Sequence, residues 1–105
     1  MNIGKRRHRV DLQMGAENQD DYGEKITVYS VYDTVWARVE PLQGRELEHA
    51  QQISGEVTHR VTVRYDSRIE TTHRVKLGER ILEITAVLNP EERNVNLVLM
   101  CKEVV

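Results

Sequence analysis

The sequence predicts an all-β fold: a small, mainly antiparallel β-barrel or sandwich of about six strands with one short helix and long polar loops. Several stretches alternate apolar and polar residues one by one, which is typical of half-buried strands. Phenylalanine is absent, so the core must consist mainly of Val, Ile and Leu. Because β-branched side chains pack well on a pleated sheet, this composition favours strands. We expect residues 1–105 to form one domain with one modest core.

The first half of the chain predicts two strands joined by a polar connection. Residues 7–14 alternate, and one face of this strand carries His8, Val10, Leu12 and Met14. Residues 15–25 are rich in Gly, Asn and Asp, which predicts a connection longer than a tight hairpin turn. Residues 26–40 are expected to form one long strand with a bend or bulge near Asp33.

The middle of the chain predicts a short helix followed by the clearest strand. Pro41 should end the preceding strand, because proline cannot continue a hydrogen-bonded ladder. Residues 44–52 contain good helix formers but are few, so this helix must depend on packing. Residues 57–65 alternate closely, and one face carries Val57, His59, Val61, Val63 and Tyr65.

The last forty residues predict a loop, a hairpin and a final strand. A polar loop over 66–72 precedes two strands, 74–77 and 80–87, with a tight turn at Gly78-Glu79. A turn at 89–92 leads into the last strand, whose inward face is formed by Val95, Leu97, Leu99 and Cys101.

Charge and cysteine content exclude several classes of protein. The net charge of −2 gives no general attraction to nucleic acid or anionic lipid. A single cysteine cannot form an internal disulfide, which fits a reducing compartment. No signal peptide or membrane span is recognisable. Charge is nevertheless uneven, and the two clusters form either a solvated surface or complementary contacts between neighbouring subunits: basic Lys5, Arg6, Arg7 and Arg9, then acidic Glu17, Asp20, Asp21 and Glu24.

No catalytic, metal or cofactor site is expected. The four histidines (8, 49, 59 and 73) belong to different predicted elements, and none is spaced from Cys101 as metal ligands are. Cys101 lies on an inward strand face, which predicts an inert buried thiol. The residues that we expect to anchor the structure are His8, Trp36, His59 and Tyr65.

Nucleic-acid binding stays open as an alternative. Small barrels bind single strands through aromatic side chains on a basic face. Arg60 and Arg64 alternate with threonines on the strand 57–65, and Arg7 and Arg9 lie on the first strand. Aromatic residues do not alternate with these arginines, so an exposed face or a subunit contact is the better interpretation.

Six short segments, in a fixed order, resemble the phage head–tail joining (adaptor, head-closure or stopper) family over nearly the whole chain. They are a basic opening at 4–10 followed by Gln13, the D-Y-G-E segment at 21–24, V-W-A-R-V at 35–39, P-L-Q-G-R-E-L at 41–47 with A-Q at 50–51, T-H-R-V-T-V-R-Y at 58–65, and a closing hairpin over 84–90 and 97–101.

The resemblance implies a structural virion protein, not an enzyme, of a long-tailed phage or prophage. Such a protein connects or closes the head for tail attachment after DNA packaging, assembles in the host cytoplasm and acts at the head–tail interface. Its implied partners are the portal or adaptor ring on one side and the tail terminator or tail tube on the other. Copies of the chain, monomeric when free, would associate into a ring on the order of six or twelve subunits. Passive contact with packaged DNA is implied, and contact with a membrane is not.

Two alternatives remain within this interpretation: a tail-terminator or tail-completion protein, and a small nucleic-acid-binding barrel. In the ring hypothesis, the polar segments 15–25 and 40–56 carry the contacts because they are longer than strand pairing requires. The candidate contact residues are Asp20, Asp21, Tyr22 and Glu24 in the first segment and Arg45, Glu46 and Gln51 in the second.

Overall fold

The computed structural model describes residues 8–53, with the backbone alone at residue 53, and 55–104. Residues 4–7 of the proposed basic opening, with Lys5, Arg6 and Arg7, lie outside the described residues. The elements in chain order are β1 (His8–Gln19), β2 (Lys25–Pro41), α1 (Gly44–Ile53), β3 (His59–Arg64), β4 (Arg74–Leu77), β5 (Arg80–Leu88), the short 3₁₀ helix η2 (Pro90–Glu92) and β6 (Asn96–Val104).

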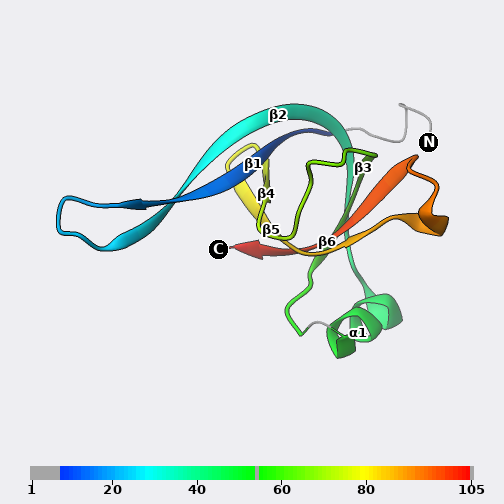
Figure 1. The fold of residues 1–105 in the computed structure, drawn as a ribbon. Helices are drawn as coiled ribbons and strands as arrows, with labels where there is room; N and C mark the ends of the chain where they lie inside the picture. The colour runs from blue at the N-terminus through cyan, green and yellow to red at the C-terminus, as the bar shows by residue number, and fades with distance from the viewer. Residues whose placement is uncertain (1–7, 54, 105) are drawn as a thin grey trace.

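The strands form a closed barrel in the order β1-β2-β3-β6-β5-β4 (Figure 1). Every neighbouring pair is antiparallel, and β4 closes the ring by pairing with β1. The prediction of a mainly antiparallel, six-stranded β fold with one short helix is therefore confirmed. None of the helices in the described ranges has the length and hydrophobicity that a membrane-spanning helix requires.

The barrel interior is filled by the predicted inward faces of the strands. Leu82, Leu99 and Val75 are completely buried, and each such side chain contributes about 1.5–3 kcal/mol of hydrophobic stabilisation. The remaining members of the cluster are Val10, Leu12, Ala37, Val61, Val63, Ile69, Ile84, Leu97 and Cys101. Since period-two alternation places every second residue inside, the strands around this core were predictable from the sequence.

The hairpin of β1 and β2 continues far beyond the barrel wall. β1 pairs with β4 only over Asp11–Gln13, and β2 pairs with β3 only from Ala37 onward. Residues 14–30, here called the arm, therefore project as a two-stranded ribbon (Figure 1). The predicted polar connection over 15–25 was wrong, because strand pairing continues to Gln19 opposite Lys25. Solvent reaches both faces of such a ribbon, so its residues need not alternate.

A bulge lies where the arm leaves the barrel, as predicted near Asp33. Leu12 pairs with Asp33 and Gln13 pairs with Val31, which leaves Tyr32 as the extra residue on β2. Met14, which was expected to face inward, is 43% exposed because β1 has already passed its last pair with β4. Gln13 is buried instead, although the alternation placed it outside.

The loop between β3 and β4 is held against this bulge by Arg68. Its Nη2 donates to Asp33 Oδ2 at 2.8 Å and to Asp66 Oδ2 at 2.7 Å, and its guanidinium lies 5.0 Å from the centre of the Tyr32 ring. The Tyr32 hydroxyl is 2.9 Å from Nδ1 of the buried His73. Burial raises the pKa of Tyr32 to about 12, so this hydroxyl stays protonated. The cluster joins the loop to the base of the arm.

Asp66→Asn should lower the free energy of unfolding by up to about 1 kcal/mol at pH 7, because it removes a charge-assisted pair with Arg68 that solvent partly screens. The side-chain hydrogen bond from Arg68 holds the pKa of Asp66 below its ordinary value of 3.8. A carboxylate with a depressed folded-state pKa stabilises fully above its unfolded pKa and loses this contribution as pH falls through the folded pKa.

Urea denaturation between pH 7 and pH 3 measures this effect. The difference between Asp66→Asn and the unchanged protein should be full above about pH 4 and should shrink below it. Asp21→Asn, a change at the exposed arm tip, is the control and should leave the curve unchanged. A difference that stays constant down to pH 3 would contradict the assignment.

Candidate functional site

The arm ends in a turn that Asp20 organises. Asp20 Oδ1 accepts hydrogen bonds from the backbone N–H groups of Tyr22 and Glu24, both at 2.9 Å. The N–H of Gly23 donates to the carbonyl of Asp20 at 3.1 Å, and Gly23 has φ = 83°, a conformation that glycine adopts without strain. Asp20 was expected to contact a partner. In this structure its Oδ1 shapes the tip, and the contact with a partner stays a prediction.

The other predicted contact residues of the tip are available to a partner. Tyr22 is 93% exposed, and Asp21 and Glu24 are also exposed. A tyrosine in this position offers a large aromatic surface and a hydroxyl group with little conformational entropy to lose on binding. The tip therefore presents one aromatic ring beside two carboxylates.

One face of the arm is apolar and uncovered. Cross-strand partners share a face, so Met14, Ala16, Val28 and Ile26 lie together. Ile26 and Val28 are 41% and 46% exposed. A two-stranded ribbon is only marginally stable in water, and this one has no third strand along residues 14–30. The arm thus exposes apolar side chains of the kind that a binding partner covers.

The opposite face of the arm rests on the barrel through Tyr29 and Arg74. The Arg74 guanidinium lies 3.6 Å from the centre of the Tyr29 ring, and its Nε donates to Gln13 Oε1 at 2.7 Å. This hydrogen bond satisfies the buried Gln13 amide. Tyr29 lies over Gly15, its cross-strand partner, where no Cβ intervenes. The four residues fix the direction in which the arm leaves the barrel.

Gly15→Ala should loosen the base of the arm. An added Cβ would lie 2.8 Å from Thr27 Cγ2 and 3.1 Å from Tyr29 Cε1, so the Thr27 methyl and the Tyr29 ring must shift and the stacking of Tyr29 on Arg74 is disturbed. Such overpacking costs about 1–3 kcal/mol. We expect faster hydrogen exchange of the arm amides by roughly tenfold, while the barrel amides are unchanged.

Gly55→Ala is the matched control for this change. Its added Cβ would meet no atom closer than 3.9 Å, so exchange in the arm should stay as in the unchanged protein. Equal exchange rates in both variants would show that Tyr29 does not hold the arm.

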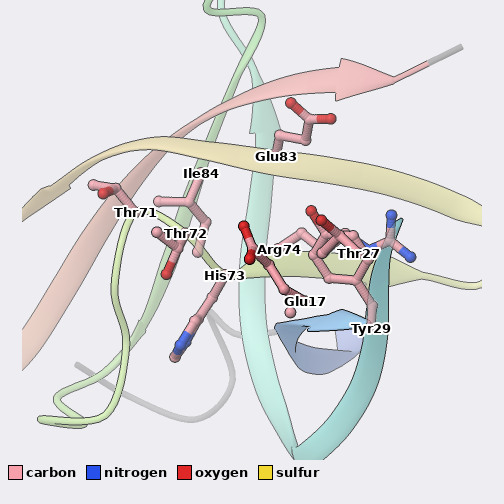
Figure 2. Close-up of a pocket in the computed structure, with 10 residues that line it drawn as sticks. Glu17, Thr27, Tyr29, Thr71, Thr72, His73, Arg74, Glu83 and Ile84 are labelled. Carbon is pink, nitrogen blue, oxygen red and sulfur yellow. The ribbon is translucent and has the colours of Figure 1, made fainter. Parts of the chain in front are cut away.

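A pocket of about 410 Å³ opens between the base of the arm and the β4–β5 side of the barrel (Figure 2). Figure 2 shows Tyr29 and Arg74 side by side on one wall and Thr71 and Thr72 on another. The pocket contains two carboxylates, from Glu17 and Glu83. Among the residues that the structure describes, no group of three or more His, Cys, Asp or Glu side chains could hold a metal ion. The pocket is a solvent-accessible gap between the arm and the barrel.

The second predicted contact segment surrounds α1 (Figure 1). Buried Leu42 and Val57 anchor its two ends, and Gln51 Nε2 donates to the Val57 carbonyl at 3.3 Å. Glu46 pairs with Arg60 of β3 within the same chain. Arg45 is exposed and has no ion pair among the described residues. Of the three candidate residues here, only Arg45 keeps its whole polar group free.

The four expected anchors lie at the rim or on the outside of the barrel. His8 is exposed, and Trp36 is 41% exposed under the Arg9 guanidinium, 5.3 Å from the ring centre. Tyr65 is 37% exposed because it follows the end of β3, where the inward face opens to solvent. These three side chains are therefore more exposed than core residues, and their role as anchors stays a prediction.

His59 is half-buried, and each of its two ring nitrogens lies near another side chain. Its Nδ1 is 2.8 Å from the Thr58 hydroxyl and its Nε2 is 3.3 Å from Arg80 Nη2. Burial lowers the pKa of His59, which favours the neutral ring. Sequence reasoning missed the buried His73, because its hydrogen-bond partner Tyr32 comes from a distant part of the chain.

Of the arginines that supported nucleic-acid binding, Arg60 is neutralised within the chain. Arg60 pairs with Glu40 as well as Glu46, and Arg38 of the adjacent strand also pairs with Glu40.

Cys101 is completely buried, and burial raises the pKa of its thiol to about 12. The prediction that Cys101 is buried is thus confirmed, and its raised pKa fits an inert thiol.

Comparisons with known proteins agree with the fold. The sequence model of the phage head completion protein family matches residues 1–104. The solution structure of protein SF1141 from Shigella flexneri 2a is 28% identical, with a TM-score of 0.72 over 98% of this chain and 96% of that chain. A chain in the virion of a native gene transfer agent particle has the same fold at 19% identity, with a TM-score of 0.64 over 94% of this chain and 96% of that chain. No curated protein matches the sequence significantly.

The family match spans the arm, the α1 segment and all six barrel strands, in the order that the resemblance had indicated. The chain belongs to the phage head completion protein family and is a structural protein of the virion, at the interface of head and tail.

Proposed function

We propose that this protein forms part of the ring that connects or closes the phage head on its portal side, so that a tail can attach after DNA packaging. The observation that carries the proposal is the division of the molecule into a rigid closed barrel and two projecting segments, the arm and the α1 segment (Figure 1). A ring subunit needs contacts with two neighbours and with the layers on each side. A barrel of this size provides few such contacts unless segments extend from it.

The charged residues of the arm tip and of the α1 segment indicate which kind of partner surface each segment contacts. The arm tip carries Asp21 and Glu24 beside Tyr22, and these groups suit a partner surface with basic and aromatic side chains. The α1 segment carries Arg45, which has no ion pair among the residues that the structure describes and suits a carboxylate of a neighbour. Ring contacts are heterologous, so two different surfaces of one chain must fit each other.

Native mass spectrometry of the protein, alone and with the cognate portal complex, tests the proposal. We expect a monomer when free and a single defined number of copies on the portal complex. Binding to a tail-tube end without portal binding would assign the protein to the tail side. Salt-sensitive binding to DNA without either partner would support the nucleic-acid alternative.

Two single changes separate the contributions of the two segments. Tyr22→Ala and Arg45→Ala each remove one exposed side chain that forms no ion pair or side-chain hydrogen bond within the described residues. Loss of portal occupancy in one variant alone would assign that contact to its segment. Glu79→Ala, at the exposed β4–β5 turn, is the control and should bind like the unchanged protein.

A further inference from the structure

The backbone of the arm has two open edges. On β2, residues 25–36 pair with β1 on one side and have no partner strand on the other. On β1, residues 14–19 pair with β2 alone, because β4 contacts only Asp11–Gln13. Alternate N–H and C=O groups along both edges therefore point away from the arm. Unpaired edges of this length are sites of strand addition.

The sequence of the β2 edge favours pairing with a further strand. Residues 26–31 read Ile-Thr-Val-Tyr-Ser-Val, with no charge and no proline. High β-propensity, low charge and the absence of proline are the properties of segments that pair with further strands. Lys25 and the acidic tip are the only charged protection at the end of this edge. A chain that left this edge open in its working state would be prone to aggregation.

We propose that the arms of neighbouring copies pair edge to edge in the ring, so that β2 of one arm adds to β1 of the next. This inference rests on the proposed ring. Rotation about a ring axis keeps all arms in the same orientation, and β1 and β2 run in opposite directions. The joint between two arms is therefore antiparallel, like the pairing inside each arm.

The charges on the two edges match this joint. Glu17 on β1 and Lys25 on β2 share one face of the arm, and neither forms an ion pair within the described chain. Directly opposite residues in an antiparallel pair point to the same face, so Glu17 of one copy can lie opposite Lys25 of the next.

The apolar side chains fit the same register. When Glu17 lies opposite Lys25, strand geometry places Ala16 opposite Ile26 and Met14 opposite Val28. These are the residues that form the uncovered apolar face within each arm. The joint would make the apolar face continuous from one copy to the next. Each arm would be shifted along its strand direction relative to its neighbour, as strands are in a barrel. A second copy of this chain therefore fits both the charge pattern and the apolar pattern of the edge.

Disulfide trapping between two single-cysteine variants tests the joint. Full-length Glu17→Cys and Lys25→Cys proteins are mixed and mildly oxidised, both free at high concentration and on the portal complex. We expect the mixed disulfide dimer to exceed that of a control mixture, Glu79→Cys with Glu91→Cys, by roughly tenfold or more. The native Cys101 is buried and stays out of the reaction.

Charge reversal provides a second measurement that needs no cysteine. Glu17→Lys places like charges across the joint, so assembly of the ring on the portal complex should weaken up to about fivefold. Glu17→Lys combined with Lys25→Glu should restore ring assembly. Ring formation on the portal with no disulfide above the control would overturn the edge pairing alone. Absence of a ring on the portal would overturn the proposed function, and the free-chain disulfide would then decide the pairing by itself.

Discussion

Leu99→Ala should lower the free energy of unfolding by about 2–5 kcal/mol, the largest effect that we expect from one substitution. Leu99 is completely buried and lies at the centre of three strands, opposite Val61 of β3 and Val87 of β5. Truncation removes apolar contacts and leaves a cavity that the closed barrel cannot easily fill, because each strand is fixed by a partner on both sides. Urea denaturation followed by far-UV circular dichroism measures the change.

Val95→Ala is the control, since Val95 directly precedes β6 but is 51% exposed. Its effect should stay below about 0.5 kcal/mol. If both variants lost the same stability, the interior of the barrel would not be the main source of stability.

Removal of the arm should abolish head completion while the barrel stays folded. Residues 16–28 can be replaced by Asn-Gly, which favours a tight hairpin turn between the paired Gly15 and Tyr29. None of the removed residues belongs to the core cluster, so the free energy of unfolding should change by less than about 1 kcal/mol. The change removes Tyr22 and the outer parts of both open edges, residues 16–19 of β1 and 25–28 of β2. We expect the yield of completed heads to fall by roughly thirtyfold or more.

Complementation of virions that lack the native protein measures this loss, with the denaturation curve of the armless chain as the check on folding. Glu79→Ala at the other exposed hairpin turn is the matched control and should complement fully. Full complementation by a folded, armless chain would show that the arm has no role in head completion.

The strands of the barrel could be predicted from the sequence because each follows a local rule. Leu97, Leu99 and Cys101 alternate with partly exposed residues along β6, and this pattern alone indicates a half-buried strand. The Gly78-Glu79 turn and the end of β2 at Pro41 also depend only on local chemistry, and both are found where they were predicted. The bulge near Asp33 was likewise visible as a polar interruption of a long apolar strand.

The arm could not be predicted in this way. Its strands are solvated on both faces, so burial imposes no alternation on residues such as Glu17, Asn18 and Gln19. The sequence of these residues is typical of a loop, although they pair in register with β2.

The sequence also does not show which candidate contact residues are already bonded within the chain. The Tyr22 side chain is almost fully exposed among the described residues, while Asp20 bonds to the backbone of the turn and Glu46 pairs with Arg60.

The sequence by itself determined that this protein is a small β-rich domain with a Val, Ile and Leu core, and its ordered segments indicated the family. Only the tertiary structure decided that the barrel closes through β4 and β1, that Arg68 links Asp33 to Asp66, and that Tyr29 and Arg74 direct the arm. Hydrophobic alternation acts between residues two apart, so the sequence displays it. Strand closure and side-chain pairing join residues tens of positions apart, and their partners become neighbours only when the chain has folded.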